Sequence, residues 1–202
     1  MNNSKLILAS SSPYRQKLLQ RLNLAFKSIS PDIDETPLDD EKAMTYVERM
    51  AKQKAFKIAK SFQSAWVIGA DQTALFNENI IGKPGNHTSA VKQLNQFSGN
   101  LVQFITGVAL VRQTSDQSIE QFYLTSTTDV YFKKLSPLLI EHYLQTEKPY
   151  NCAGSFKIES MGPILFNRVI SDDPTSLEGL PLIALCKLFS LAKIDIFNFD
   201  DN

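Results

Sequence analysis

The chain has 202 residues, of which 43% are hydrophobic and 21% are charged, as is ordinary for a soluble globular protein. Its 21 basic and 21 acidic side chains balance, which argues against a general nucleic-acid-binding surface but leaves room for a few cations around a small anion. No apolar stretch approaches the roughly 18 residues that a membrane span needs, and the first apolar run is too short for a signal peptide. We therefore expect a soluble, cytoplasmic protein that binds neither nucleic acid nor membrane.

Predicted strands and helices alternate from the start of the chain. A continuous apolar run predicts a strand over residues 5–10, and a helix is expected from Pro13 to about Leu22. A short strand is predicted over 26–30, and two prolines with three acids make 31–37 a loop. Residues 39–62 then show the spacing of an amphipathic helix, with apolar positions at Met44, Val47, Ala51, Ala55, Ile58 and Phe62.

The same alternation continues to the other end. The run 65–70 predicts a core strand that ends on Asp71, followed by a hairpin around residues 77–79 and a helix capped by Thr88 that ends near Phe97. Two long β-type segments follow over 101–112 and 121–132. Ser136 then opens a helix, and a last helix is expected over 177–191. The pattern predicts an α/β fold, and no linker separates two domains, so we expect a single domain over 1–202.

A polar turn follows the first predicted strand. Ser10, Ser11 and Ser12 precede Pro13, and Tyr14 and Arg15 come next. Serine before proline is a common helix start, so the turn can be a helix cap. Hydroxyl groups, free helix amides and an arginine are also the groups that converge on a phosphate. Taken alone, the turn leaves both interpretations open.

Asp71 and Gln72 follow the core strand over 65–70. In open α/β sheets the ligand site lies beyond the carboxyl ends of the strands, where a carboxylate can be buried or bind a metal. The alternative is an ordinary turn aspartate. The preceding run Val-Ile-Gly-Ala is too apolar for an edge strand, which favours a functional role for Asp71.

The acidic loop offers oxygen ligands. Glu35 lies there with Asp32 and Asp34, and Mg²⁺ or Mn²⁺ binds through one or two carboxylates plus substrate phosphates, although a solvated surface loop is the alternative. Two cations accompany these acids: Lys83 stands on a turn between Gly82 and Pro84, and Lys54 borders the apolar stripe of its helix.

The absence of several motifs argues against several reaction classes. The sequence has no GxxxxGK[ST] or GxGxxG loop and no GxSxG elbow. His87 and His142 lie outside any HExxH motif and are expected to be surface or helix residues. Cys152 and Cys186 lack CxxC spacing and are expected to be reduced thiols. The remaining carboxylates, cations and hydroxyls suit metal-assisted attack of water on a phosphate.

Taken together, these segments resemble the Maf family of nucleotide pyrophosphatases over nearly the whole chain. Seven motifs occur in the family's order: Leu-Ala-Ser-Ser-Ser-Pro with Arg15, Asp34-Glu35-Thr36-Pro37, Lys54-Ala55, Gly69-Ala70-Asp71-Gln72, Gly82-Lys83-Pro84, Thr106-Gly107 and Cys152-Ala153-Gly154-Ser155-Phe156. The resemblance implies a fold like that of inosine-triphosphate pyrophosphatases, an elongated mixed sheet flanked by helices. It also implies hydrolysis of a nucleoside triphosphate to the monophosphate and pyrophosphate, a divalent metal (Mg²⁺, Mn²⁺ or Co²⁺) and a cytoplasmic homodimer.

The resemblance assigns roles to the singled-out residues. Ser10, Arg15, Lys54 and Lys83 would hold the triphosphate, Glu35 and Asp71 would bind the metal, and Asp71 would orient or deprotonate the attacking water. Many members carry a second basic residue after the arginine, whereas this chain has Gln16. The serine turn is accordingly expected to bind phosphate, which is compatible with helix capping.

Three positions indicate the base. Tyr14, Gln72 and Glu159 are similar to the family branch that prefers 7-methyl-GTP rather than to the pyrimidine branch. An aromatic face stabilises the positive charge of 7-methylguanine, and a carboxylate can accept from its N1–H and exocyclic amine. We expect removal of modified nucleotides, with a link to cell-division arrest left open. The alternatives are a dTTP or UTP pyrophosphatase and a nucleotide sensor without turnover.

Overall fold

The computed structural model describes residues 6–197, and it confirms the predicted α/β fold. The chain divides into two compact units that are interleaved in sequence. The first contains residues 6–71, 106–126 and 173–197, and the second contains 72–105 and 127–172. Three long strands run through both units: β3 (Trp66–Phe76), β5 (Leu101–Gln113) and β6 (Ile119–Phe132).

The other elements belong to one unit each. The first unit holds β1 (Leu6–Ala9), α1 (Pro13–Gln20), β2 (Lys27–Ile29), α2 (Ala43–Ala59), the 3₁₀ helix η3 (Ser176–Glu178) and α5 (Leu182–Leu191). The second holds β4 (Asn79–Ile81), α3 (His87–Phe97), α4 (Pro137–Glu147), η1 (Ala153–Ser155), η2 (Gly162–Leu165) and β7 (Phe166–Ser171).

The strands form one sheet in the order β2-β1-β3-β5-β6-β7, and β4 pairs with β3. β1 is parallel to both β2 and β3, with Leu8 beside Ser28 on one side and Ile68 on the other. The pairs β3–β4 and β6–β7 are antiparallel. A central parallel strand is buried on both faces, which is why β1 is continuously apolar.

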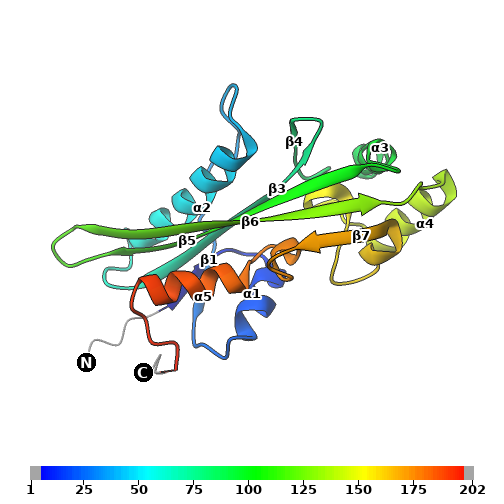
Figure 1. The fold of residues 1–202 in the computed structure, drawn as a ribbon. Helices are drawn as coiled ribbons and strands as arrows, with labels where there is room; N and C mark the ends of the chain where they lie inside the picture. Colours follow the sequence, from blue (N-terminus) through cyan, green and yellow to red (C-terminus); the bar gives the residue numbers. More distant parts are fainter. Residues whose placement is uncertain (1–5, 198–202) are drawn as a thin grey trace. The chain divides into compact units, whose positions relative to one another are not determined.

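In the first unit, helices cover both faces of the sheet. Successive side chains of a strand point to opposite faces, so the two faces draw on alternate residues of β1 and β3. One face packs against α1 and α5, which are drawn below the sheet in Figure 1, through residues that include Leu8, Leu18, Ile68 and Leu185. The other face packs against α2, through residues that include Ile7, Ala51, Ala55 and Val67.

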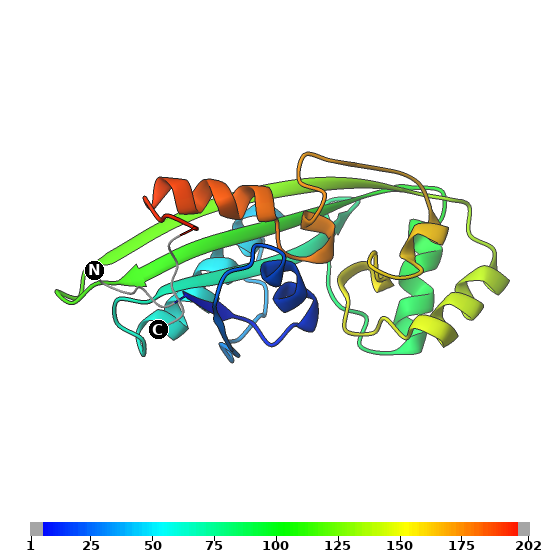
Figure 2. The ribbon, with the colours of Figure 1, turned by 90° about the horizontal axis from the view of Figure 1, so that it is seen from below.

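The second unit has an aromatic core. Phe104, Phe132, Phe156 and Phe166 meet edge to face, with ring centroids 4.8 to 6.1 Å apart. Gly154 has a φ of +76°, and a Cβ there would lie 2.6 Å from the Phe104 ring, so both the backbone and the packing require glycine. α3 and α4 run beside each other in this unit (Figure 2).

The structure corrects several expected boundaries. The core strand continues past Asp71 to Phe76, α3 is capped by Asn86 instead of Thr88, and the last helix begins at Leu182. α2 begins at Ala43 and ends at Ala59, which leaves Met44 51% exposed and Phe62, beyond the helix, 37% exposed. The edge strand β7 was not predicted, because its residues 167–170 are all exposed and carry no alternating pattern.

The hairpin at 77–79, the two long β segments and the helix opened by Ser136 are confirmed. Within residues 6–197, no helix combines the length and the apolar character that crossing a membrane requires.

Candidate functional site

A buried lysine bridges two carboxylates in the first unit. Lys54 Nζ lies 2.7 Å from Asp71 Oδ1 and 2.8 Å from Glu35 Oε1. The side chains of Lys54 and Asp71 are only 5% and 6% exposed, whereas that of Glu35 is 41% exposed. Three residues that the sequence singled out separately, on a helix, a strand and a loop, therefore form one charged cluster.

A glycine allows α2 to approach β3 closely enough for this contact. A Cβ at Gly69 would lie 2.1 Å from the backbone oxygen of Ala51 and 2.7 Å from the backbone nitrogen of Ala55. Gly69 and Asp71 are two residues apart on one strand, so both face α2. The close approach at Gly69 therefore places Lys54, the neighbour of Ala55, opposite the Asp71 carboxylate.

The second oxygen of Asp71 is an unsatisfied acceptor. Asp71 Oδ2 is buried and has no hydrogen-bond partner among the described residues. Such an atom is costly to bury unless a ligand or ion completes it. Oxygen donors from one or two carboxylates fit Mg²⁺ or Mn²⁺, so Asp71 and Glu35 have the chemistry that a divalent cation needs. Within residues 6–197 no group of three or more His, Cys, Asp or Glu is placed to hold a metal without further ligands.

Helix α2 also fixes the acidic loop. Tyr46 donates its hydroxyl proton to the Glu35 carbonyl at 2.9 Å, and Arg49 Nη2 donates to the Thr36 carbonyl at 3.1 Å. Glu41 in turn accepts from Arg49 Nε at 2.7 Å. Burial, followed by the charges of Asp71 and Glu35, raises the pKa of Tyr46, so the hydroxyl stays a donor. The loop around Glu35 is thus tied to α2, while residues 34–40 are themselves exposed.

Sequence reasoning did not find Tyr46 and Arg49. For Tyr46 the signal lay in the helical spacing, because Tyr46, Met50 and Lys54 are four residues apart and share one face of α2. From that face the sequence analysis singled out only Lys54.

The serine turn is a helix cap in the structure. Ser12 accepts from the Arg15 backbone amide at 3.4 Å, and buried Ser10 Oγ accepts from the Ser12 amide at 3.1 Å. Ser28 Oγ donates to the Ser10 carbonyl at 2.6 Å, which ties the turn to β2. The capping interpretation of the turn is confirmed.

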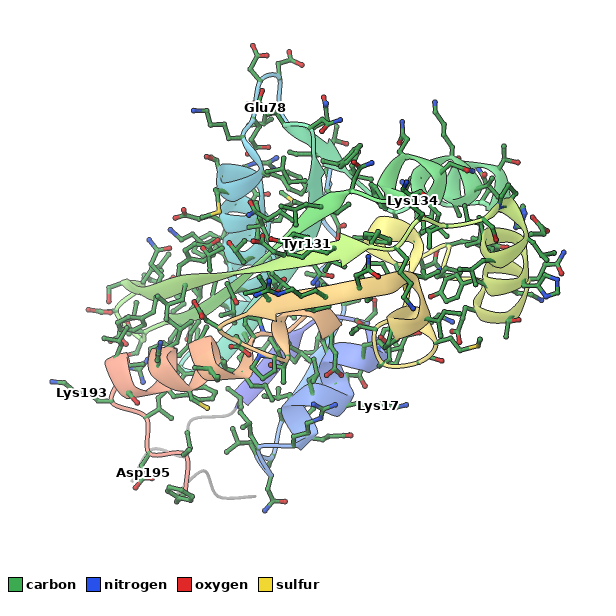
Figure 3. All side chains as sticks on the ribbon, turned by 45° about the vertical axis from the view of Figure 1, so that its right-hand side comes forward. Lys17, Glu78, Tyr131, Lys134, Lys193 and Asp195 are labelled. Atoms are coloured by element: carbon green, nitrogen blue, oxygen red, sulfur yellow. The ribbon has the colours of Figure 1, made fainter. Side chains whose placement is uncertain are left out.

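Arg15 is held in the electrostatic field of the two carboxylates. Its Nε donates to the Gly179 carbonyl at 2.8 Å. Desolvation lowers the pKa of Arg15, and the negative charges of Asp71 and Glu35 partly oppose that change. Lys17, on the same helix, is exposed and points away from the ribbon in Figure 3. Arg15 is therefore near enough to Asp71 and Glu35 to feel their charges, whereas Lys17 is exposed.

The remaining predicted site residues occur in the second unit, except for Tyr14, which is half-buried on α1. Lys83 and Glu159 are exposed there, and the charges of both affect the pKa of the Cys152 thiol. Burial raises the pKa of the Cys152 thiol, Glu159 adds to that rise, and Lys157 and Lys83 oppose it. Gln72 follows Asp71 directly on β3, so its side chain points to the other face of the strand.

The cysteines and histidines agree with expectation. Cys152 and Cys186 are both free thiols. His142 is exposed on α4, and His87 at the start of α3 contacts the Tyr150 hydroxyl and Glu141 at 3.1 and 3.0 Å.

The first unit thus combines an α/β sheet, a capped helix start that carries an arginine, and a buried lysine–carboxylate cluster. The chain belongs to the Maf family, because the family model described as "Maf-like protein" matches residues 5–192.

Two relatives support this assignment. The chain is 46% identical to a 7-methyl-GTP pyrophosphatase of Pseudoalteromonas translucida, over 98% of this chain and 96% of the relative. It is 45% identical to a 7-methyl-GTP pyrophosphatase of Pseudoalteromonas atlantica, over 96% of this chain and 97% of the relative. Among solved structures, the Ham1 protein of Staphylococcus aureus is similar with a TM-score of 0.44 and 17% identity, over 65% of this chain and 73% of that one.

Proposed function

We propose that this protein hydrolyses 7-methyl-GTP to 7-methyl-GMP and pyrophosphate. The observation that carries the proposal is the Lys54 bridge between Asp71 and Glu35, with the second Asp71 oxygen buried and unsatisfied. The names of the two Pseudoalteromonas relatives supply the substrate. In this reaction the oxygen of water forms a bond to the α-phosphorus. The bond from the α-phosphorus to the oxygen that it shares with the β-phosphorus breaks, so pyrophosphate is the leaving group.

The cations hold the triphosphate. Arg15 and Lys54 each carry one positive charge beside two carboxylates, so the cluster in the first unit is close to neutral without substrate. A triphosphate therefore needs further positive charge, for which we assign Lys83 and a divalent cation. Ser10 would donate its hydroxyl proton to a phosphate oxygen. Developing charge on the leaving pyrophosphate would be offset by these fixed cations.

Asp71 would act on the attacking water. A buried carboxylate oxygen that lacks a partner can accept a proton from water and orient it toward phosphorus. Lys54 holds the other oxygen of the same carboxylate at 2.7 Å and fixes its direction. Glu35 and Asp71 would hold Mg²⁺, Mn²⁺ or Co²⁺, which supplies charge neutralisation and Lewis acidity when bound.

Tyr14, Gln72 and Glu159 would select the base. The exposed Glu159 carboxylate offers paired acceptors to a guanine edge, and the Tyr14 ring offers a face to the cationic 7-methylguanine. Uracil and thymine lack the paired donors. Gln72 would add a hydrogen bond.

We extend the proposal to the cellular setting. The protein would act as a single domain over 1–202, in the cytoplasm and as a homodimer, and would remove modified nucleotides. These assignments rest on the family resemblance.

Pyrophosphate release and substrate ranking test the proposal. Purified protein with Mn²⁺ is assayed with 7-methyl-GTP, GTP, UTP and dTTP, and kcat/KM is measured for wild type, Glu159→Gln and Glu78→Gln. Glu78 is an exposed hairpin acid and serves as the matched control (Figure 3). We expect the highest kcat/KM for 7-methyl-GTP, and a reduced preference in Glu159→Gln only.

The other outcomes are equally specific. A preference for UTP or dTTP contradicts the proposed substrate and favours the pyrimidine branch. Nucleotide binding without pyrophosphate release contradicts the enzyme proposal and favours a sensor.

A further inference from the structure

We infer that the carbonyl of Gly179 positions Arg15 for phosphate binding, and that buried contacts of residues 173–180, here called the anchor segment, hold this carbonyl in place. The inference rests on the proposed function, in which Arg15 binds the triphosphate. It adds positioning residues from the far end of the sequence, 164 positions away from Arg15.

The contact fixes the plane of the guanidinium group. Arg15 Nε donates to the Gly179 oxygen at 2.8 Å, so this one donor is taken by the protein. The guanidinium is planar with its donors in a fixed fork, and a bond at Nε therefore sets the direction of both terminal nitrogens. Those two nitrogens are the donors that form paired hydrogen bonds to a phosphate. Arg15 is thus oriented before any anion arrives.

Gly179 presents its carbonyl from a backbone shape that suits glycine. Its φ is +106°, where other residues are strained. A Cβ there would be 3.5 Å from Arg15 Nε, which is ordinary contact, so the glycine is needed for its backbone and not for space. An alanine at this position should therefore rotate the carbonyl without blocking Arg15.

Buried polar contacts hold the anchor segment in place. Asp173 is 3% exposed, and its Oδ2 accepts from the Ala184 amide at 3.1 Å, at the N-terminus of α5. Thr175 Oγ1 lies 2.9 Å from the Leu180 oxygen and accepts from the Leu182 amide at 2.8 Å. Thr106 on β5 donates its hydroxyl proton to the Ser176 carbonyl at 3.0 Å. The segment is consequently fixed on both sides of Gly179.

One exposed contact of the same segment provides a control. Glu178 pairs with Arg21 at 3.0 Å, and the Arg21 side chain is 53% exposed. Surface pairs contribute little, and this one does not touch Arg15. Glu178→Gln therefore changes the neighbour of Gly179 while it leaves the Gly179 carbonyl in place.

Pyrophosphate binding tests the inference. The affinity of the full chain for inorganic pyrophosphate with Mg²⁺ is measured by calorimetry for wild type, Gly179→Ala, Thr175→Val and Glu178→Gln. Because small displacements of a positioning group have large effects, we expect Gly179→Ala to raise Kd about tenfold or more. Thr175→Val should raise Kd in the same direction, and Glu178→Gln should stay within about twofold of wild type.

A double-mutant cycle with Arg15→Lys separates positioning from general structure. Lysine keeps the charge but has no Nε–H fork, so Gly179→Ala should have no further effect on Kd in that background. If Gly179→Ala weakens binding equally in both backgrounds, the carbonyl does not act through Arg15 and the inference is wrong. If Gly179→Ala does not fold, Thr175→Val takes its place in the double-mutant cycle with Arg15→Lys.

These measurements also distinguish failure of the inference from failure of the proposed function. A wild type that binds pyrophosphate with the expected cycle but hydrolyses no nucleotide contradicts the enzyme proposal alone. A wild type that hydrolyses 7-methyl-GTP while Gly179→Ala and Thr175→Val keep the wild-type Kd contradicts the inference alone.

Discussion

Lys54 Nζ and Asp71 Oδ1 lie 2.7 Å apart, and both side chains are almost completely removed from solvent. An ion pair in this position is costly to desolvate and costly to break, because removing one partner leaves a buried charge without compensation. The ion pair that matters for the stability of the fold therefore includes Asp71, the carboxylate to which we assign the attacking water.

Lys54→Met should destabilise the protein strongly. Breaking a buried ion pair costs about 3–5 kcal/mol, whereas loss of an exposed pair costs about 0–1 kcal/mol. Lys52→Met, which breaks the more exposed pair of Lys52 with Glu48, is the matched control on the same helix. Urea unfolding at pH 7 measures both. Equal stability of the two variants would contradict the role of burial.

Asp71→Asn should leave the fold intact and lower turnover about a hundredfold or more, the range for loss of a positioned acid–base group. Asparagine can still accept from Lys54 through its amide oxygen, which preserves the contact seen at Oδ1. Circular dichroism checks the fold and pyrophosphate release gives kcat. Asp39→Asn, in an exposed turn, should retain the wild-type rate. A near-normal rate in folded Asp71→Asn would remove this residue from the mechanism.

Gly69→Ala should disrupt the site by moving α2. The added Cβ would meet the Ala51 oxygen at 2.1 Å, so the helix must shift and carry Lys54 with it. We expect a lower Tm and a loss of turnover larger than the loss of stability explains. Gly82→Ala has open space around its Cβ and serves as the stability control. Unchanged Tm and kcat in Gly69→Ala would contradict the close approach of α2 and β3.

Activity should require a divalent cation, and Glu35→Gln should weaken its use. The amide removes one negative charge from the pair Glu35 and Asp71, so a higher Mn²⁺ concentration is needed for half-maximal turnover. Titration of Mn²⁺ into chelator-treated protein measures this concentration. Full turnover after exhaustive chelation would disprove the metal requirement.

Both thiols should react slowly in the folded protein. Burial raises the pKa of Cys152 and of Cys186, so at pH 8 less of each is thiolate than in free cysteine. Iodoacetamide should therefore alkylate the native chain more slowly than glutathione, and unfolding in guanidinium should remove the difference. Mass spectrometry resolves the two sites. A native rate equal to that of glutathione would contradict the raised pKa values.

Local patterns in the sequence predict much of this fold. Continuous apolar runs, helical spacing and turn residues placed β1, α2, α4 and the hairpin before β4, because each signal is contained within a few neighbouring residues. The cluster of Glu35, Lys54 and Asp71 was predicted as separate residues of one site, and the structure joins them.

Contacts between distant residues were beyond those patterns. The extension of β3 past Asp71 depends on its pairing with β4, and β7 is defined by its pairing with β6. The anchoring of Glu35 by Tyr46 likewise depends on how a loop folds over a helix. Periodicity marks which face of an element is apolar, but it does not identify the polar partner that a side chain on that face will reach.

The bond between Arg15 and Gly179 also has a consequence for synthesis of the protein. Arg15 leaves the ribosome early, but its carbonyl partner follows 164 residues later. Contacts so distant in sequence form late, because the intervening chain must first be ordered. A nascent chain that stops before residue 173 has the serine turn and Arg15 but no acceptor for Nε, so its arginine is not oriented. In this fold, Arg15 can therefore be oriented only after residue 179 has been made.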